Sequence, residues 1–243
     1  MCGIIGAASS RSVGKILIKG LQLMEYRGYD SAGVVLNKDE EILRLRSLGK
    51  VSKLEEIMIS EKPKAFSGIA HTRWATHGAP SEENAHPHGS NDDIYIVHNG
   101  IIENHEEIRG FLRNEGYEIT SETDSELIAH LVHFHKKDTQ DTLQALMKAT
   151  HELNGAYSIA AVCKKEKGKV YAARQKSPLL VGLGIEENFV ASDPLAIVNI
   201  TEKFHMLEDG DFAVVTKEDV VIYDKEGDPV ERDELKIDAT ATS

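Results

Sequence analysis

The segment Ala156 to Cys163 is apolar at nearly every position, and it restricts the fold of this chain more than any other feature. A strand with one face in water alternates apolar and polar residues, whereas a strand without that alternation must be covered on both faces. Further apolar segments of strand length occur along the chain, together with helices that carry one apolar side. We therefore predict an α+β fold in which a sandwich of sheets is flanked by helices.

Strands and helices are expected along the whole chain, without an internal repeat or a low-complexity tract. Apolar residues at helical spacing predict the first helix, Val13 to Met24. The other expected helices are Val51 to Ile59, Asn104 to Asn114, Thr123 to His135 and Thr139 to Leu153. The expected strands are Cys2 to Ala8, Gly33 to Leu36, Ile42 to Leu45, Gly68 to His71, Ile94 to His98, Ile101 to Ile102, Ala156 to Cys163, Val170 to Ala173, Leu179 to Gly182, Phe189 to Ala191, Phe212 to Thr216 and Val220 to Tyr223. The 243 residues are expected to form one large domain.

Charge and cysteine content exclude several classes of function. Lys and Arg number 28 against 40 Asp and Glu, a formal net charge of −12, which disfavours nucleic acid or an anionic membrane as a partner. Cys2 and Cys163 are too few for a disulfide framework and fit a reducing cytosol. No apolar run approaches the roughly 20 residues of a membrane helix, and neither a signal peptide nor a lipoprotein anchor precedes Cys2. We expect a soluble, cytoplasmic protein.

Cys2 follows the initiator methionine, and a small residue at position 2 is the usual condition for removing Met1. The mature chain would then carry a thiol and a free α-amine on one residue. An α-amine with a pKa of about 7.7–8.0 can take the thiol proton near neutral pH, which is the principle of N-terminal nucleophile hydrolases. The alternative is that Cys2 is a small hydrophobe at the start of an apolar strand, and its position alone favours this alternative.

The segment His71 to Gly78 concentrates functional groups where a strand runs out into a loop. It holds Trp74, the only tryptophan, and Arg73, which can grip a carboxylate with two hydrogen bonds. A solvated arginine and an anchoring tryptophan are the alternative. The histidines of this segment and of Asn84 to His88 follow no metal-binding pattern such as His-Glu-x-x-His, so we predict no metal site.

Two further motifs each have a structural and a functional interpretation. Asn99-Gly100 between apolar runs is a leading signal for a hairpin turn, and the same turn can direct the Asn99 amide and the Gly100 N–H at a developing oxyanion. Thr123 to Glu126 fits a capping box, with Thr123 as N-cap and Asp124 in the first helical turn. Taken alone, Asp124 is better explained by the helix start than by ligand binding.

Six blocks of sequence occur in one order and together are more specific than any of them alone. They are Met1-Cys2-Gly3-Ile4, Glu25-Tyr26-Arg27-Gly28-Tyr29-Asp30-Ser31-Ala32-Gly33, His71-Thr72-Arg73-Trp74-Ala75-Thr76-His77-Gly78, Asn84-Ala85-His86-Pro87-His88, His98-Asn99-Gly100-Ile101-Ile102-Glu103-Asn104 and Ser121-Glu122-Thr123-Asp124. From Cys2 into the 230s, the chain resembles the glutaminase domain of the glucosamine-6-phosphate synthases, or glutamine–fructose-6-phosphate aminotransferases (isomerizing), which are class II glutamine amidotransferases. Ala79 is a departure, since most relatives are expected to carry Glu in this mobile loop.

The resemblance implies a role for each matched residue. Cys2 would be the nucleophile that attacks the side-chain amide of L-glutamine, with its own α-amine as general base. Asn99 and the Gly100 N–H would form the oxyanion hole. Arg73 would hold the substrate α-carboxylate and Asp124 the α-ammonium group. The remaining matches are Thr76 and His77 as substrate contacts, Arg27 as a substrate-site residue near Cys2, and Trp74 as part of a lid that gates ammonia passage.

The resemblance also implies a fold, a domain boundary and partners. The fold would be the four-layer αββα sandwich of N-terminal nucleophile hydrolases. Residues 2–236 would form the glutaminase domain and residues 237–243 the start of an interdomain linker, with the sugar-isomerase domains absent from this chain. The ammonia would serve glucosamine 6-phosphate synthesis from fructose 6-phosphate in the full-length enzyme, expected to be a homo-oligomer. The reaction needs no metal or organic cofactor.

Three alternatives stay open at this point. A phosphoribosylpyrophosphate or asparagine-forming amidotransferase shares the terminal cysteine and the Asn-Gly pair, but the blocks at Tyr26 to Gly33 and Ser121 to Asp124 favour the hexosamine family. A non-catalytic glutamine sensor would need no nucleophile, so the presence of Cys2 argues against it. A purely structural domain would have no reason to gather these groups.

Overall fold

The computed structural model describes residues 2–38 and 41–237. Residues 238–243, which hold most of the segment expected to begin a linker, lie outside the described residues, as does Met1. In the described part of the chain, no helix combines the length and apolar character needed to cross a membrane.

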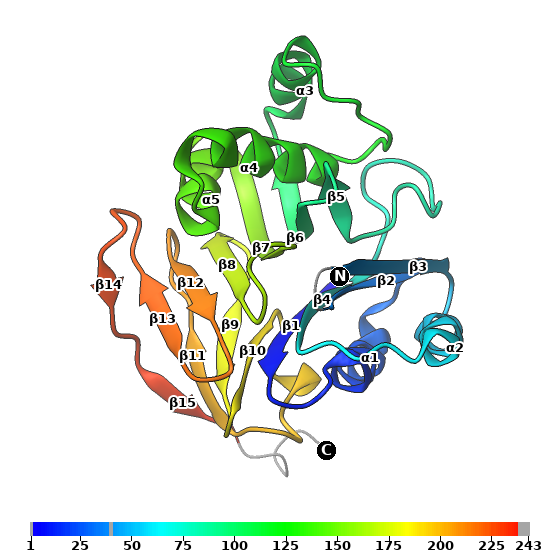
Figure 1. Ribbon diagram of the computed structural model, residues 1–243, viewed down its shortest axis with the longest axis vertical. Helices are drawn as coiled ribbons and strands as arrows, with labels where there is room; N and C mark the ends of the chain where they lie inside the picture. The colour runs from blue at the N-terminus through cyan, green and yellow to red at the C-terminus, as the bar shows by residue number, and fades with distance from the viewer. Residues whose placement is uncertain (1, 39–40, 238–243) are drawn as a thin grey trace.

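Two antiparallel sheets lie face to face in the middle of the molecule (Figure 1). The eight-stranded sheet has the order β15 (Glu234–Lys236), β11 (Lys203–Met206), β9 (Leu180–Leu183), β10 (Glu187–Ala191), β1 (Gly3–Ser9), β4 (Ser67–Arg73), β2 (Ser31–Asn37) and β3 (Ile42–Leu48). The seven-stranded sheet has the order β14 (Pro229–Val230), β13 (Val220–Tyr223), β12 (Phe212–Val215), β8 (Val170–Gln175), β7 (Gly155–Cys163), β6 (Ile94–Ile102) and β5 (His88–Ser90).

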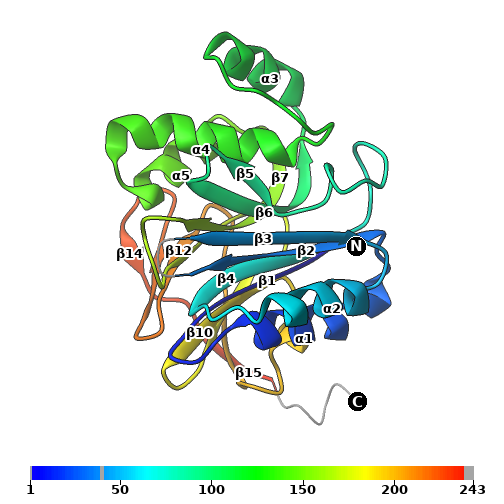
Figure 2. The ribbon, with the colours of Figure 1, turned by 45° about the vertical axis from the view of Figure 1, so that its right-hand side comes forward.

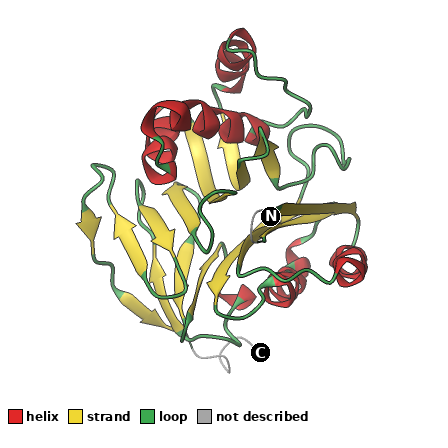
Figure 3. Ribbon diagram, in the orientation of Figure 1, coloured by secondary structure: helices red, strands yellow, loops and turns green. Residues whose placement is uncertain are grey.

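Helices cover the outer face of each sheet, as Figures 2 and 3 show. The outer side of the eight-stranded sheet carries α1 (Gly14–Leu23) and α2 (Val51–Glu61). The outer side of the seven-stranded sheet carries α4 (Ser125–Thr139) and α5 (Thr142–His151), and α3 (His105–Asn114) packs on α4. Short 3₁₀ turns occur at η1 (Glu25–Arg27) and η2 (Pro194–Ala196). The αββα sandwich predicted from the sequence is confirmed.

Three apolar layers follow from the alternation of side chains along the strands. In β1, Ile4 packs between the sheets and Ile5 packs under α1. In β7, Ala160 faces the opposite sheet, whereas Ile159 faces the layer of α4 and α5. Successive residues of a strand point to opposite faces, so a strand covered on both faces must be apolar at both sets of positions. This explains the composition of Ala156 to Cys163.

The structure corrects the hairpin predicted at Asn99-Gly100. Both residues lie inside the continuous strand β6, which pairs with β7 from Ile94 opposite Cys163 to Ile102 opposite Gly155. Gly100 has a φ of +126°, and a Cβ atom there would lie 2.0 Å from the carbonyl oxygen of Ala156. The glycine is therefore required by the close approach of two strands rather than by a turn.

Candidate active site

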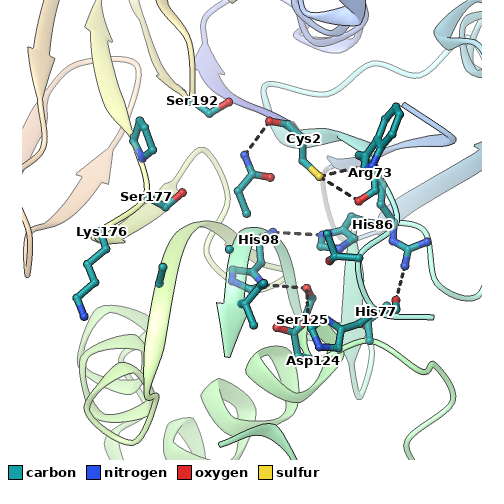
Figure 4. Close-up of a pocket in the computed structure, with 18 of the residues that line it drawn as sticks. Cys2, Arg73, His77, His86, His98, Asp124, Ser125, Lys176, Ser177 and Ser192 are labelled. Carbon is teal, nitrogen blue, oxygen red and sulfur yellow. Dashed lines mark hydrogen bonds between the residues drawn. The ribbon is translucent and has the colours of Figure 1, made fainter. Parts of the chain in front are cut away.

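A cavity of about 380 Å³ opens where the two sheets meet the first turn of α4 (Figure 4). The start of β1 and the end of β4 lie on one side of it, and β6 and α4 lie on the other. All nine residues expected at the site line it: Cys2, Arg27, Arg73, Trp74, Thr76, His77, Asn99, Gly100 and Asp124. The fold therefore gathers residues that are spread over 123 positions of sequence, from position 2 to position 124.

The Cys2 thiol is half-buried at the wall of this cavity and faces the backbone of Trp74. The Trp74 N–H donates to Sγ at 3.1 Å, and Sγ lies 3.6 Å from the Trp74 carbonyl oxygen. Burial raises the pKa of the Cys2 thiol, although the Trp74 N–H opposes this effect. Among the described residues, no side-chain base forms a hydrogen bond with Sγ. Chemistry at this sulfur therefore needs another proton acceptor.

Asn99 reaches across from β6 and is held at both ends of its amide. Its Nδ2 donates to the Cys2 carbonyl oxygen at 3.0 Å, and its Oδ1 lies 2.8 Å from Nε2 of His71 on β4. A side-chain amide nitrogen carries two hydrogens, so one remains after the bond to Cys2. The Asn99 amide is thus fixed beside the Cys2 backbone.

Asp124 connects the helix start to the opposite strand. Its Oδ2 accepts a hydrogen bond from the Ile102 N–H at 2.8 Å, and the residue is 5% exposed. The capping box predicted here is wrong in its register, because the helix begins at Ser125 with Asp124 as its N-cap. Thr123 Oγ1 still accepts from the Glu126 N–H at 3.3 Å. The Glu126 carboxylate accepts from the N–H groups of Thr120 and Ser121 and not from that of Thr123.

The Arg73 guanidinium is enclosed by the loop that follows it. It donates to the carbonyl oxygens of His77, Gly78 and Ala79, the last two at 3.2 and 3.3 Å. The Asp30 carboxylate lies 3.9 Å away. Arg73 is only 4% exposed, so its charge is held at the cavity wall while it shapes the loop that carries Thr76 and His77.

Trp74 and Arg27 lie at the edge of the cavity. The Trp74 ring is about half exposed and packs on Gly28, whose φ of +81° turns the chain beneath it. Arg27 pairs with Asp193 at 2.6 Å and donates to the Cys2 carbonyl at 3.5 Å.

Sequence reasoning missed several residues that build the site. Asp30 accepts from the Ala75 N–H at 2.5 Å, and Ser192 accepts from the Ile4 N–H at 2.8 Å at the cavity wall. Asp30 lay within a matched block, which was the available signal, whereas Ser192 had none.

The histidines at the site form no metal cluster. Within residues 2–38 and 41–237, no group of three or more His, Cys, Asp or Glu side chains is arranged to hold a metal ion.

Comparison with known proteins gives similarities along nearly the whole chain. The chain is 53% identical over 235 residues to glutamine–fructose-6-phosphate aminotransferase (isomerizing) from Haemophilus influenzae, covering 96% of this chain and 38% of that protein. It is 50% identical over 238 residues to the same enzyme from Pseudomonas putida, covering 97% and 39%. The chain thus spans about two fifths of the length of these curated relatives. These similarities confirm the resemblance predicted from the six blocks.

A solved structure and a family model agree with this result. Glutamine phosphoribosylpyrophosphate amidotransferase from B. subtilis, solved with ADP and GMP, superposes with a TM-score of 0.79 at 23% identity, covering 92% of this chain and 49% of that one. That likeness concerns the fold. The family described as the glutamine amidotransferase domain matches residues 71–199, more than half of the chain. The chain therefore belongs to the family of glutamine amidotransferase domains.

Proposed function

We propose that this domain hydrolyses L-glutamine to L-glutamate and ammonia, with Cys2 of the mature chain as the nucleophile. The observation that carries the proposal is the cavity of about 380 Å³, in which a thiol, an amide donor, a buried cation and a buried carboxylate line one space. Glutamine carries a reactive amide at one end and both an ammonium and a carboxylate group at the other. The cavity offers a complementary group to each of these three.

The reaction requires a base for a thiol whose pKa is raised by burial. Removal of Met1 supplies it, because it frees an α-amine on the same residue, and an unperturbed α-amine has a pKa of about 7.7–8.0. The amine takes the thiol proton while sulfur attacks the amide carbon, then gives that proton to the departing nitrogen as the C–N bond breaks. Ammonia leaves and a thioester remains. Water then attacks the thioester, the amine accepts its proton, and glutamate and the thiol are regenerated.

The oxyanion formed in each step would be stabilised by Asn99 and Gly100. The free hydrogen of the Asn99 amide and the Gly100 N–H are the proposed donors, and such donors act on charge that develops only in the transition state. Arg73 would hold the substrate α-carboxylate, Asp124 the α-ammonium group, and Thr76 and His77 the rest of the substrate. These groups bind substrate and transition state alike.

The role of the domain in a longer protein follows from its relatives. Glutamine–fructose-6-phosphate aminotransferases are about two and a half times as long as this chain. We infer that residues 2–236 are the glutaminase domain of such an enzyme, a homo-oligomer whose sugar-isomerase domains use the ammonia to convert fructose 6-phosphate to glucosamine 6-phosphate. The Trp74 loop would be the lid between the two sites.

A glutamate-release assay combined with intact-mass analysis tests the proposal. We expect turnover to require both Cys2 and removal of Met1, so Cys2→Ala and a population that retains Met1 should be inactive. Cys163→Ala is the matched control, since this second cysteine is fully buried and lies outside the cavity lining. Full activity of Cys2→Ala would disprove the mechanism.

A second assay tests the larger role. With glutamine and fructose 6-phosphate, residues 1–243 should release glutamate without forming amino sugar, and the sugar phosphate should not raise the rate, because stimulation requires a second coupled site. Formation of amino sugar by this chain alone would place the domain boundary elsewhere.

A further inference from the structure

Two buried and stacked histidines, His71 and His86, lie beside the Asn99 amide, and His71 contacts it. His71 is 1% exposed, and its ring stacks on that of His86, with centroids 4.0 Å apart and planes 14° from parallel. His86 is itself fixed, because its Nδ1 accepts from the His98 N–H at 3.2 Å. The stacking fixes the plane of the His71 ring, and in that plane Nε2 lies 2.8 Å from Asn99 Oδ1.

The two hydrogen bonds of the Asn99 amide determine each other. Nδ2 must face the Cys2 carbonyl oxygen, 3.0 Å away, because the reversed amide would bring two acceptor oxygens together. Oδ1 then faces His71, so the His71 nitrogen opposite it must carry a proton. The His71 tautomer with its proton on Nε2 thus supports the amide orientation that the Cys2 carbonyl requires, and the other tautomer would oppose it.

The environment of His71 permits one protonation state. Burial lowers the pKa of His71 to about 3, so the ring is neutral at physiological pH. A neutral imidazole has one N–H. If Nε2 holds it, Nδ1 is left bare, and Nδ1 indeed has no hydrogen-bond partner among the described residues. The absence of a donor or acceptor opposite Nδ1 is therefore compatible with the proton on Nε2.

We propose that His71 is a positioning residue, which as the neutral Nε2–H tautomer holds the Asn99 amide with its nitrogen toward Cys2. This inference rests on the proposed function, in which the second hydrogen of that nitrogen stabilises the oxyanion. His71 does not line the cavity. It acts through Asn99 across the interface of the two sheets, from β4 to β6.

His71→Gln and His71→Asn form the test pair. The glutamine side-chain nitrogen reaches the position of Nε2, whereas the asparagine side-chain nitrogen reaches only that of Nδ1. Both are polar amides, so they share the cost of replacing the buried ring. We expect His71→Gln to keep most of kcat. In His71→Asn, kcat should fall by a large part of the factor of about 10²–10³ that removal of one oxyanion donor costs. KM for glutamine and the rate of Cys2 alkylation by iodoacetamide should match in the two variants, since neither depends on the oxyanion.

His130→Asn is the control for a general structural effect. His130 is also buried, at 6% exposure, but it bonds to Ser90 and Glu126 and lies outside the cavity lining. Its kcat should stay near that of the unmodified chain. Equal kcat in His71→Gln and His71→Asn, or a change confined to KM, would overturn the proposal.

Nuclear magnetic resonance supplies a readout that does not depend on turnover. Long-range ¹H–¹⁵N correlation distinguishes a protonated ring nitrogen from a bare one, and we expect His71 to carry its proton on Nε2 between pH 5 and 8. A proton on Nδ1 would refute the positioning role even in an active enzyme. Inactivity of the unmodified, Met1-free chain would instead refute the proposed function and leave the tautomer result to stand by itself.

Discussion

Hydrogen bonds to the carbonyl group of Cys2 hold this residue in the site. It accepts from Asn99 at 3.0 Å and from Arg27 at 3.5 Å. The next two backbone N–H groups bond to side chains, that of Gly3 to Thr72 and that of Ile4 to Ser192, which follows β10. None of these bonds uses the amide nitrogen of Cys2. Converting that nitrogen to a free amine therefore leaves every one of these contacts in place.

At this scale we predict that binding and chemistry separate by residue. Asn99→Ala should lower kcat by about 10²–10³, the usual cost of one oxyanion donor. Arg73→Ala should mainly raise KM, because it removes the charge that we propose holds the α-carboxylate in substrate and transition state alike, and it releases the carbonyl groups of the loop. Steady-state kinetics of glutamate release measure both quantities. If kcat of Asn99→Ala equals that of the unmodified chain, the pair Asn99-Gly100 has no role beyond the strand.

Among the elements, the loop after β4 depends on two supports that lie far apart in sequence. Its carbonyl groups wrap around the Arg73 guanidinium, and the Trp74 ring rests on Gly28. A Cβ atom at position 28 would lie 2.6 Å from the Trp74 Cζ3 atom. Because the ring is half exposed, the ring rather than the backbone would move.

We predict that Gly28→Ala displaces Trp74 and weakens glutamine binding. The tryptophan emission should shift, and this readout is specific because Trp74 is the only tryptophan. Gly49→Ala is the matched control, since Gly49 has a similar φ of +85° but no atom within 4 Å of its would-be Cβ. It carries the same backbone strain without the clash. An identical emission spectrum in Gly28→Ala and the unmodified chain would show that the ring does not rest there.

The elements also show what a single sequence can predict. The core strand β7 and helix α1 follow from apolar pattern alone, because their side chains alternate between two covered faces or repeat with helical period. Strands β14 and β15 were not predicted, since they are short, partly exposed and defined by backbone pairing with a neighbouring strand. The arrangement at Asn99 was equally hidden, because its partners Cys2 and His71 become neighbours only when the two sheets pack.

At the scale of the whole molecule, the sandwich encloses histidines where the two sheets and α4 meet. His71, His86, His88 and His98 are all at most 4% exposed. Burial lowers the pKa of each of them, to about 3 for His71 and His88. The folded state therefore holds these rings neutral at a pH where the unfolded chain protonates them.

We predict that mild acid destabilises the fold. In the unfolded chain a histidine takes up a proton near pH 6.5, whereas the buried rings take one up only at far lower pH. At these pH values the unfolded state binds more protons than the folded state. The stability that the neutral histidines contribute is therefore fully present above about pH 6.5, and the free energy of unfolding falls as the pH decreases toward 3. Each such histidine contributes a slope of up to about 1.4 kcal/mol per pH unit. Urea denaturation at pH 7, 6 and 5 measures it.

Between pH 6.5 and 5, the change in the free energy of unfolding reports on the buried histidines and not on the neighbouring carboxylate of Glu126. Hydrogen bonds lower the pKa of Glu126, so the stability that it contributes is lost only as pH falls below the ordinary range of a glutamate. In His88→Gln the side-chain amide nitrogen can take the place of Nε2 opposite Thr123 Oγ1, but it does not titrate. The slope of this variant should therefore be smaller by up to about 1.4 kcal/mol per pH unit, the contribution of one histidine. A free energy of unfolding that stays constant from pH 7 to 5 would mean that the rings are not held neutral, and the tautomer assigned to His71 would lose its physical basis.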